Sequence, residues 1–375
     1  MKILLIGDFS SFSKNLSEGF RRIGHQAFVF SWGDGFKRIE QDPRNSYQIS
    51  LRNIIIRGKY VKSLSFFNRL ICSIKLKLKV KQMANEEKWD IALVINPDFL
   101  KEPYKFWMPF FTKSMISSLL NNQENIFLIC CGKDIVPNHY WATHKEGKMH
   151  PILHKYKKIP RKEWHLYKYY STFINKVIPV TYSYAVPYRN SKLAAPFIVF
   201  PTIPMPITVS KFISHNEIGD RVIIFHGINR PKQKGTPFII EAMDKLSKDY
   251  PSKVLCIAKG KMPLKEYLEI MKNANIVIDQ CYAGSAGMNA LYAMSMGKVV
   301  LGGNEPENMV EFGCNVPVIN IKADANQIYS ELVRLVQNPE LILKLSQASR
   351  KYVESIHDSK TIAEKYINSI SQFIS

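Results

Sequence analysis

The sequence lacks the features that define several large protein classes. No apolar run reaches the ~18 residues that a membrane-spanning helix needs. The apolar segment Lys2–Gly7 stops at Asp8 and is too short for a signal peptide. The six cysteines include no Cys-x-x-Cys pair and have no histidine nearby, so we expect reduced thiols without a zinc site or a disulfide framework. These absences argue against secretion, a structural metal and integral membrane topology.

Acidic residues are scarce in the first half of the chain. Residues 1–200 contain 32 Lys and Arg but only 14 Asp and Glu, a net charge of +18. Residues 201–375 carry a net charge of only +3. The imbalance predicts an anionic partner for the first half, whereas the second half does not require one.

The 375 residues suit two domains of ordinary size. Apolar segments alternate with helical patterns almost throughout, which predicts an α/β fold with two doubly wound, Rossmann-like domains facing a cleft. Prolines at 201, 204 and 206 mark the boundary, because proline fits neither a helix interior nor a central strand. We expect domains at 1–205 and 206–356, and a last helix at 357–375 that packs back on the first domain. The expected strands are Lys2–Gly7, Gln26–Trp32, Ile91–Ile95, Ile126–Cys131, Val222–Phe225, Val254–Ile257, Ile276–Ile278, Val299–Leu301 and Val316–Ile319.

Two basic stretches of the first half contain aromatic or apolar residues at regular spacing. Residues 59–84 place Tyr60, Leu64, Phe67, Ile71, Ile74 and Leu78 on one helical face, as in a helix lying on an anionic membrane surface. A packed helix with a solvated basic face is an equal alternative, and Ile74–Lys81 also alternates as a strand does. In residues 145–168 lysines alternate with aromatics, which suits a lipid interface or an anionic glycan carrier. No nucleic-acid motif accompanies them.

The first half offers few chemical groups. The turn after the first strand has a single glycine, Gly7, so a dinucleotide cofactor is disfavoured. Ser10 and Ser11 follow it, either as acceptor-side groups or as simple helix caps. Asp134 and His139 are the best acid–base or hydroxyl-orienting candidates, and we take them as catalytic candidates. Asp134 can equally be a helix N-cap.

Two loops of the second half resemble anion-binding loops. His226–Gly235 follows an apolar strand and contains Arg230, Lys232 and Lys234 before a helix, an arrangement that suits a pyrophosphate. A surface basic loop is the alternative. The second loop consists of small residues before a short helix, so that an anion can approach the helix N-terminus. Its candidate diphosphate ligands are Gly284, Ser285, Ala286, Gly287, Met288 and Asn289.

These loops resemble the donor domain of the GT-B glycosyltransferases, in particular retaining glycosyltransferase family four (glycosyl transferases group 1). Arg230 and Lys234 match the family's donor-diphosphate Arg and Lys, and Ala293–Val300 is similar to its Glu-Ala-Met-Ala-x-Gly-x-Pro-Val-Val segment. The likeness covers most of 221–356 and more weakly 1–50 and 90–140. It implies a two-domain transferase with no dinucleotide cofactor and no essential metal, and the sequence has no Asp-x-Asp.

The chain departs from the family's two-glutamate motif. Gly284 and Tyr292 stand where the family has glutamates near the donor sugar and on the ribose. We expect Glu305 or Glu307 to supply the ribose contact, since a carboxylate–hydroxyl bond contributes about 1.5–3 kcal/mol. Asn289 and Tyr292 are weaker substitutes, and Tyr292 can equally be a core residue.

The sequence therefore predicts a metal-independent, retaining hexosyltransferase without a cofactor. It would use a UDP- or GDP-sugar and a glycan or lipid-linked acceptor in surface polysaccharide synthesis. We expect it in the cytoplasm, peripheral on the inner face of the plasma membrane, with no nucleic-acid partner. A catalytically inactive relative that binds nucleotide sugars, and a nucleotide-sugar epimerase of similar fold, are the alternatives.

Overall fold

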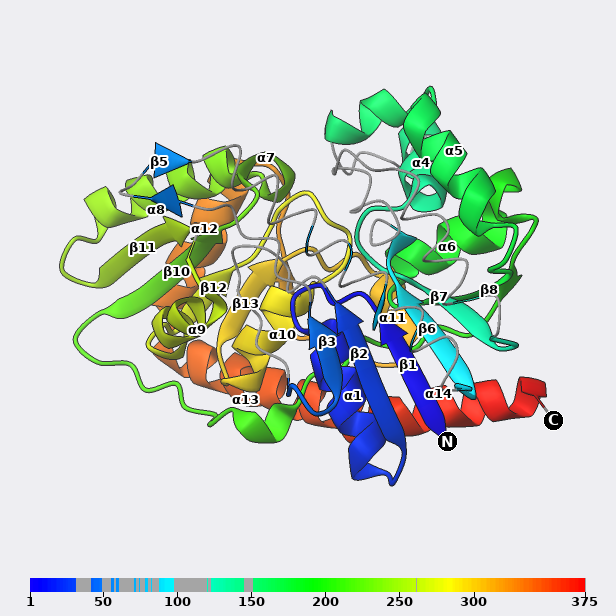
Figure 1. Ribbon diagram of the computed structural model, residues 1–375. Helices are drawn as coiled ribbons and strands as arrows, with labels where there is room; N and C mark the ends of the chain where they lie inside the picture. The colour runs from blue at the N-terminus through cyan, green and yellow to red at the C-terminus, as the bar shows by residue number, and fades with distance from the viewer. Residues whose placement is uncertain are drawn as a thin grey trace.

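The computed structural model describes residues 1–31, 42–48, 88–97, 123–144, 151–260 and 262–374, with a few isolated positions between 55 and 120. Within these residues the chain forms two parallel sheets flanked by helices (Figure 1). The first sheet has the order β3 (Ser46–Gln48), β2 (Gln26–Ser31), β1 (Lys2–Ile6), β6 (Ile91–Ile95), β7 (Ile126–Cys130), β8 (Lys176–Pro179) and β9 (Ile198–Val199).

The second sheet contains five strands, also parallel. Their order is β11 (Val254–Gly260), β10 (Val222–Ile228), β12 (Ile276–Ile278), β13 (Val299–Gly302) and β14 (Val318–Asn320). A two-stranded antiparallel sheet is formed by β4 (Ile55–Ile56) and β5 (Lys59–Tyr60).

Helices connect the strands of both sheets. The first half contains α1 (Phe12–Arg22), α4 (Ile135–Thr143), α5 (Arg161–Tyr170) and α6 (Tyr182–Asn190), with 3-10 turns η4 (Pro151–Tyr156) and η5 (Lys192–Ala194). The second contains η6 (Val209–Lys211), α7 (Pro231–Lys234), α8 (Thr236–Asp249), α9 (Leu264–Lys272), α10 (Met288–Ser295), α11 (Glu307–Phe312), α12 (Ala325–Val336), α13 (Pro339–Ile356) and α14 (Ser359–Ile374).

The predicted α/β fold with doubly wound parallel sheets is confirmed, and its cause is visible in the central strands. Every residue of β6 and β7 is buried, as expected for strands covered by helices on both faces. Each of the nine strands expected from the sequence has a counterpart, with ends that differ by a few residues. The strands β3, β4, β5, β8 and β9 are not among the predicted ones. They are two to four residues long, too short for an apolar run to identify a strand, and β8 also begins with Lys176 and ends with Pro179.

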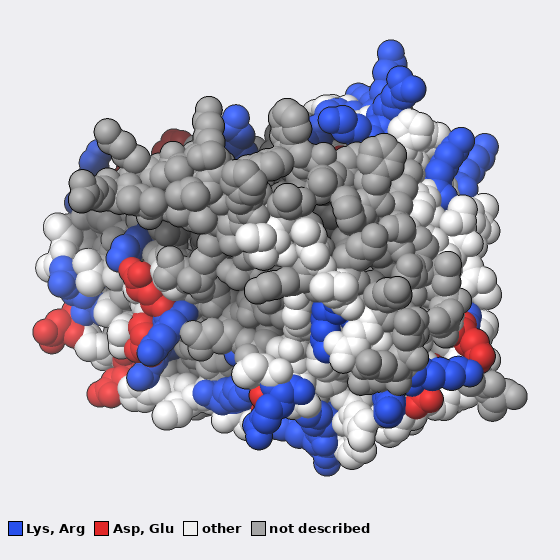
Figure 2. All heavy atoms as spheres, viewed as in Figure 1, with Lys and Arg blue, Asp and Glu red and all other residues white. Residues whose placement is uncertain are grey.

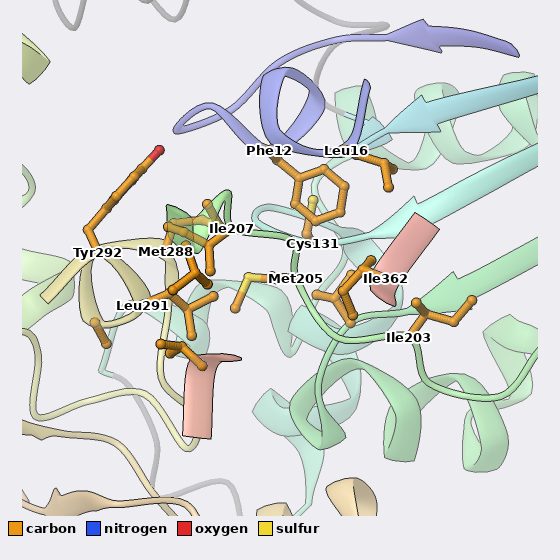
Figure 3. Packing of buried hydrophobic residues seen from close by; sticks show 14 of the residues in the cluster. Phe12, Leu16, Cys131, Ile203, Met205, Ile207, Met288, Leu291, Tyr292 and Ile362 are labelled. Carbon is orange, nitrogen blue, oxygen red and sulfur yellow. The ribbon is translucent and has the colours of Figure 1, made fainter. Parts of the chain in front are cut away.

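One apolar cluster continues from the first sheet into the second. It includes Phe12 of α1, Met205 and Ile207 of the connecting segment, Leu291 of α10 and Ile362 of α14 (Figure 3). The domain limits at 205 and 356 stay predictions, because this shared cluster crosses the junction.

The last helix packs on the first half of the chain, along the lower edge of the molecule in Figure 1. Tyr366 of α14 meets Phe20 of α1 edge to face, with ring centroids 6.2 Å apart. Gly19 permits this approach, since a Cβ there would collide with the carbonyl oxygen of Ser359. Ile207 forms a parallel β-bridge opposite Asp358: its N–H donates to the His357 carbonyl and its carbonyl accepts from the Ser359 N–H, each at 2.9 Å. The start of α14 is thereby joined to the connecting segment.

The two basic stretches differ from the sequence interpretation. Tyr60 lies in β5 and not in a helix, because the β-branched residues of β4 and this aromatic favour strand pairing. Positions 71, 74, 78, 79 and 82 are helical, and most of the predicted 59–84 helix lies outside the described residues. In the second stretch and directly after it, Tyr156, Tyr167 and Tyr170 are core residues, so these three aromatics cannot contact a lipid surface.

Candidate functional site

Segments that follow strands of the first sheet contact the β12–α10 loop and α10 of the second half. From the first half, α6 begins beside the loop that follows β7, and the Tyr184 hydroxyl donates to the Gly132 carbonyl (3.1 Å). From the second half, the loop between β12 and α10 reaches α6, where the Ser183 and Ser285 hydroxyl oxygens are 2.9 Å apart. Arg230 also lies near α6: burial raises the pKa of Tyr184, and the Arg230 charge opposes that rise. Residues more than a hundred positions apart thus meet at one site.

Arg230 and Lys234 take different positions in the loop after β10. Arg230 is the exposed N-cap residue of α7. Lys234 is buried, and its ammonium lies 2.8 Å from the Asp279 carboxylate, with each side chain 3% exposed. The surface-loop alternative therefore does not describe Lys234. A ligand that meets Lys234 must share it with a carboxylate that follows β12 directly.

Asp279 has several partners that keep it ionised. Burial raises the pKa of Asp279, but the charge and hydrogen bond of Lys234 and the amide of Asn289 outweigh it and hold the pKa below its ordinary value. The Asn289 amide nitrogen is 3.5 Å from the carboxylate oxygen that faces Lys234. Burial also lowers the pKa of His226 to about 4, and this ring binds the Ile278 carbonyl and the Thr236 hydroxyl, each at 2.9 Å. His226 is therefore a neutral neighbour of the ion pair at physiological pH.

Two hydrogen bonds connect the small-residue loop before α10 to the segment that follows β13. The Gly284 carbonyl accepts from the Glu305 backbone N–H (2.9 Å) and from the Asn308 amide (2.8 Å). Gly287 is the N-cap of α10, and no side chain caps that helix. Ala286 is partly buried against the apolar cluster. Met288 points into the same cluster (Figure 3), so it can offer a ligand only its backbone.

Glu305 and Glu307 lie near the first half of the chain. Burial raises the pKa of Tyr182 at the start of α6, and these two carboxylates raise it further. Glu305 also forms an ion pair with Lys322 and is 26% exposed on its side chain. Glu307 is exposed in the first turn of α11. Both remain within reach of the site edge formed by α6 and the Ser285 loop.

Tyr292 is a core residue whose hydroxyl reaches the first half. It is 3% exposed, packs edge to face on Phe212, and donates to the Ser10 carbonyl (3.3 Å). This favours the core alternative over a ribose ligand. Ser10 and Ser11 have positive φ angles of 54° and 63°, a conformation that costs non-glycine residues energy and is often found at functional turns.

The β1–α1 turn is capped by a residue other than its serines. Ser11 makes no side-chain cap, whereas Asp8 accepts from the Ser13 backbone N–H (3.0 Å). The structure therefore does not support the capping alternative for Ser11. Gly7, with φ 96°, begins this turn and donates to the Phe30 carbonyl (2.8 Å).

Asp134 and His139 have structural partners within the first half. Asp134 is the buried N-cap of α4, accepting from the Val136 backbone N–H (3.1 Å), and its second oxygen accepts from the Tyr188 hydroxyl (2.6 Å). This geometry supports the N-cap alternative. The His139 ring binds the Tyr156 carbonyl (2.8 Å). A catalytic role for either stays a prediction, and their contacts give it no support.

Sequence reasoning missed Asp279 and Ser183. Asp279 had a usable signal, since a carboxylate directly after an apolar strand lies at the edge where parallel sheets bind ligands. Ser183 had none, because its importance comes from a contact with Ser285, 102 positions away.

Comparison with solved structures identifies the fold. The chain is similar to a sucrose-phosphate synthase from Thermosynechococcus elongatus, at TM-score 0.62 and 13% identity, over 100% of this chain and 99% of that one. It is similar to the Anabaena protein HepE in complex with UDP and glucose, at TM-score 0.59 and 11% identity, over 99% and 100%. A putative UDP-N-acetylglucosamine 2-epimerase from Listeria monocytogenes matches at TM-score 0.54 and 12% identity, over 100% and 96%.

These likenesses show the class of fold: two Rossmann-like domains arranged as in GT-B glycosyltransferases. No family model and no curated protein sequence matches the chain. Among the described residues, no helix has the length and apolarity needed to cross a bilayer.

Proposed function

We propose that this protein transfers a hexosyl group from a nucleoside-diphosphate sugar, with UDP or GDP as the nucleotide, to an acceptor hydroxyl. One observation carries the proposal. The basic loop of Arg230 and the uncapped start of α10 lie together at the carboxyl edge of the second sheet, and Ser285 there contacts Ser183 of the first half. The GT-B fold supports it, since solved relatives in this fold include a HepE complex with UDP and glucose.

The residues of the second half account for the chemistry of the leaving group. Arg230 and Lys234 supply positive charge, and the start of α10 supplies backbone N–H groups with no side-chain cap. Fixed donors and charges aimed at developing negative charge are often the largest contribution to catalysis. The donor diphosphate would lie between them, with Glu305 or Glu307 on the ribose. This arrangement requires no side-chain nucleophile.

The first half would hold the acceptor. Its β1–α1 turn, with Ser10 and Ser11, contacts Tyr292 at the junction, and its net charge of +18 suits an anionic, lipid-linked glycan at the membrane surface. We further propose that the enzyme belongs to the retaining family four, works without a metal and acts in surface polysaccharide synthesis. The family motif around Ala293–Val300 supports that assignment.

A thermal-shift panel with UDP, GDP, CDP, ADP and their sugars tests the donor site. A ligand at about 100 times its dissociation constant adds about 2.7 kcal/mol of stability, which is a shift of several degrees for domains of this size. We expect a shift for one base, lost in Arg230→Ala. Arg221→Ala is the matched control, because it removes the same charge just before the first residue of β10. No shift with any nucleotide would contradict the proposal.

A nucleotide-sugar epimerase is the second candidate, because the structural relatives include putative and named UDP-N-acetylglucosamine 2-epimerases. An epimerase converts the donor with no acceptor present, whereas a transferase needs the acceptor for turnover. Incubation of the protein with its stabilising nucleotide sugar alone, followed by chromatography of the sugar, separates them. Nucleotide binding with no turnover of any kind would support a binding-only relative, for which the missing glutamates at 284 and 292 are the reason.

A further inference from the structure

The Lys234–Asp279 ion pair is unusual because both side chains are buried. Nitrogen and oxygen are 2.8 Å apart, and each side chain is 3% exposed. Burying two charges costs several kcal/mol of hydration, and an apolar pair of similar volume is often as stable or more stable. The pair is therefore poorly explained as a device for stability, and its position suggests another role.

Asp279 touches both loops of the candidate diphosphate site. Its backbone N–H extends the β12–β13 pairing by donating to the Leu301 carbonyl (2.9 Å), which fixes the carboxylate at the end of the sheet. That carboxylate binds Lys234 at the end of α7 and the amide of Asn289 in the first turn of α10. The Cys281 N–H donates to the Lys234 carbonyl (3.0 Å), so the two loops also share a backbone bond.

The hydrogen-bond donors of the Lys234 ammonium suggest that it binds a ligand. An ammonium has three N–H donors, and in the described contacts Asp279 accepts one. A buried ammonium with donors to spare, next to the start of α10, can bind diphosphate oxygens once its direction is fixed. A flexible lysine would first have to lose side-chain entropy of up to about 2 kcal/mol.

We propose that Asp279 is the positioning residue of the diphosphate site, holding the Lys234 ammonium between the loop after β10 and the first turn of α10. This inference rests on the proposed function and deepens it. Asp279 acts through Lys234 and Asn289 and does not itself contact the donor. Its carboxylate fixes the direction of the Lys234 ammonium and offsets part of the cost of burying that charge.

The ionisable groups around the pair keep their charge over a range of pH in which the pair can be tested. From β10, His226 has its pKa lowered to about 4 by burial. From the β12–α10 loop, Cys281 has its pKa raised to about 11 by burial, and burial also raises the pKa of Tyr267 in α9. Arg230, at the N-cap of α7, is permanently charged. Between about pH 7 and about pH 9, these neighbours therefore keep their charge.

The test measures UDP affinity by calorimetry across this window for the wild type, Asp279→Asn and Asp279→Glu. The asparagine variant leaves the Lys234 ammonium buried without a counter-charge, so it should lose its proton at lower pH. We expect its dissociation constant for UDP to rise about tenfold between about pH 7 and about pH 9, while the wild-type value changes by less than about threefold. Asp279→Glu restores the charge and should restore most of the flat profile.

Two controls separate positioning from a structural role. Asp244→Asn removes an exposed carboxylate from α8 of the same half and should leave the profile flat. In a Lys234→Met background, Asp279→Asn should add no pH dependence. A folded Asp279→Asn protein with wild-type UDP affinity and no pH dependence of that affinity would overturn the inference. Asp279 would then have only a structural role.

The proposed function can fail separately. If the wild type binds no nucleoside diphosphate, that function is wrong, and inorganic pyrophosphate is then titrated in the same variants. Pyrophosphate binding with the Asp279-dependent pH profile would keep the positioning role. Binding without that profile, or no binding, would overturn it.

Discussion

The two halves of the molecule hold their positive charge in opposite ways. The first half has a large excess of positive charge, and its described basic residues around α5, including Lys157, Lys158 and Lys162, are exposed. Figure 2 shows Lys and Arg gathered at the end of the molecule where Figure 1 places α4 and α5. The second half is nearly balanced, yet it places Lys234 in the interior against a fixed carboxylate.

This difference shows that the net charge of a half does not indicate where a small ligand would bind. Exposed charges act together, over about 10 Å at moderate salt, and are suited to broad anionic surfaces. A buried pair acts at one point, where water screens little and small displacements matter. We therefore propose an extended, anionic partner for the first half and a small diphosphate ligand for the second.

The largest expected effect comes from breaking the buried pair. Lys234→Met leaves Asp279 buried and unpaired, which should lower the free energy of unfolding by about 3–5 kcal/mol. The double variant Lys234→Met/Asp279→Leu should recover most of that loss but not UDP binding. Chemical denaturation and calorimetry measure the two properties. Lys248→Met, at an exposed position near the end of α8, is the control, and a double variant that binds UDP normally would contradict the account.

The next effect concerns the exposed charge of the first half. Replacing Lys157, Lys158 and Lys162 by Gln should weaken binding to phosphatidylglycerol vesicles by about 3 kcal/mol, roughly a hundredfold, because each basic residue contributes about 1 kcal/mol. The UDP-induced thermal shift should not change. The matched control replaces Lys248, Lys253 and Lys272 of the second half, which are also exposed. Equal losses in both triple variants, in a sedimentation assay, would remove the assignment of the membrane surface to the first half.

The smallest effect concerns the contact between the halves. Arg189 of α6 binds both oxygens of Glu311 in α11 (2.7 and 2.9 Å), and the Thr202 hydroxyl donates to the same carboxylate. Burial raises the pKa of Glu311, but these partners hold it below its ordinary value.

Glu311→Gln should therefore cost about 1 kcal/mol at neutral pH, a modest value because Arg189 is 43% exposed on its side chain. A depressed carboxyl pKa gives stability that is present above the unfolded pKa and lost as pH falls through the folded pKa. Denaturant titrations at neutral and acidic pH should thus converge. A constant difference between the two proteins would show that the charge of Glu311 is not the cause.

The sequence was informative where one segment determines its own structure. Ile91–Ile95 and Val299–Leu301 are apolar runs that form the buried strands β6 and β13, and the local composition of the basic loop at Arg230 predicts an anion site. Strand β8 could not be predicted, because Lys176 and Pro179 at its ends leave it without a continuous apolar pattern. For Lys234 the sequence indicated a diphosphate ligand but not the ion pair with Asp279. Its partner is 45 positions away, and such a contact depends on the order of strands in the sheet.

The most direct test of the central claim is a crystal structure of the protein with UDP. The account predicts the diphosphate between Arg230 and the first turn of α10, with oxygens within hydrogen-bond distance of Lys234 while the Lys234–Asp279 pair persists. A diphosphate bound elsewhere, or one that displaces Asp279 from Lys234, would contradict it.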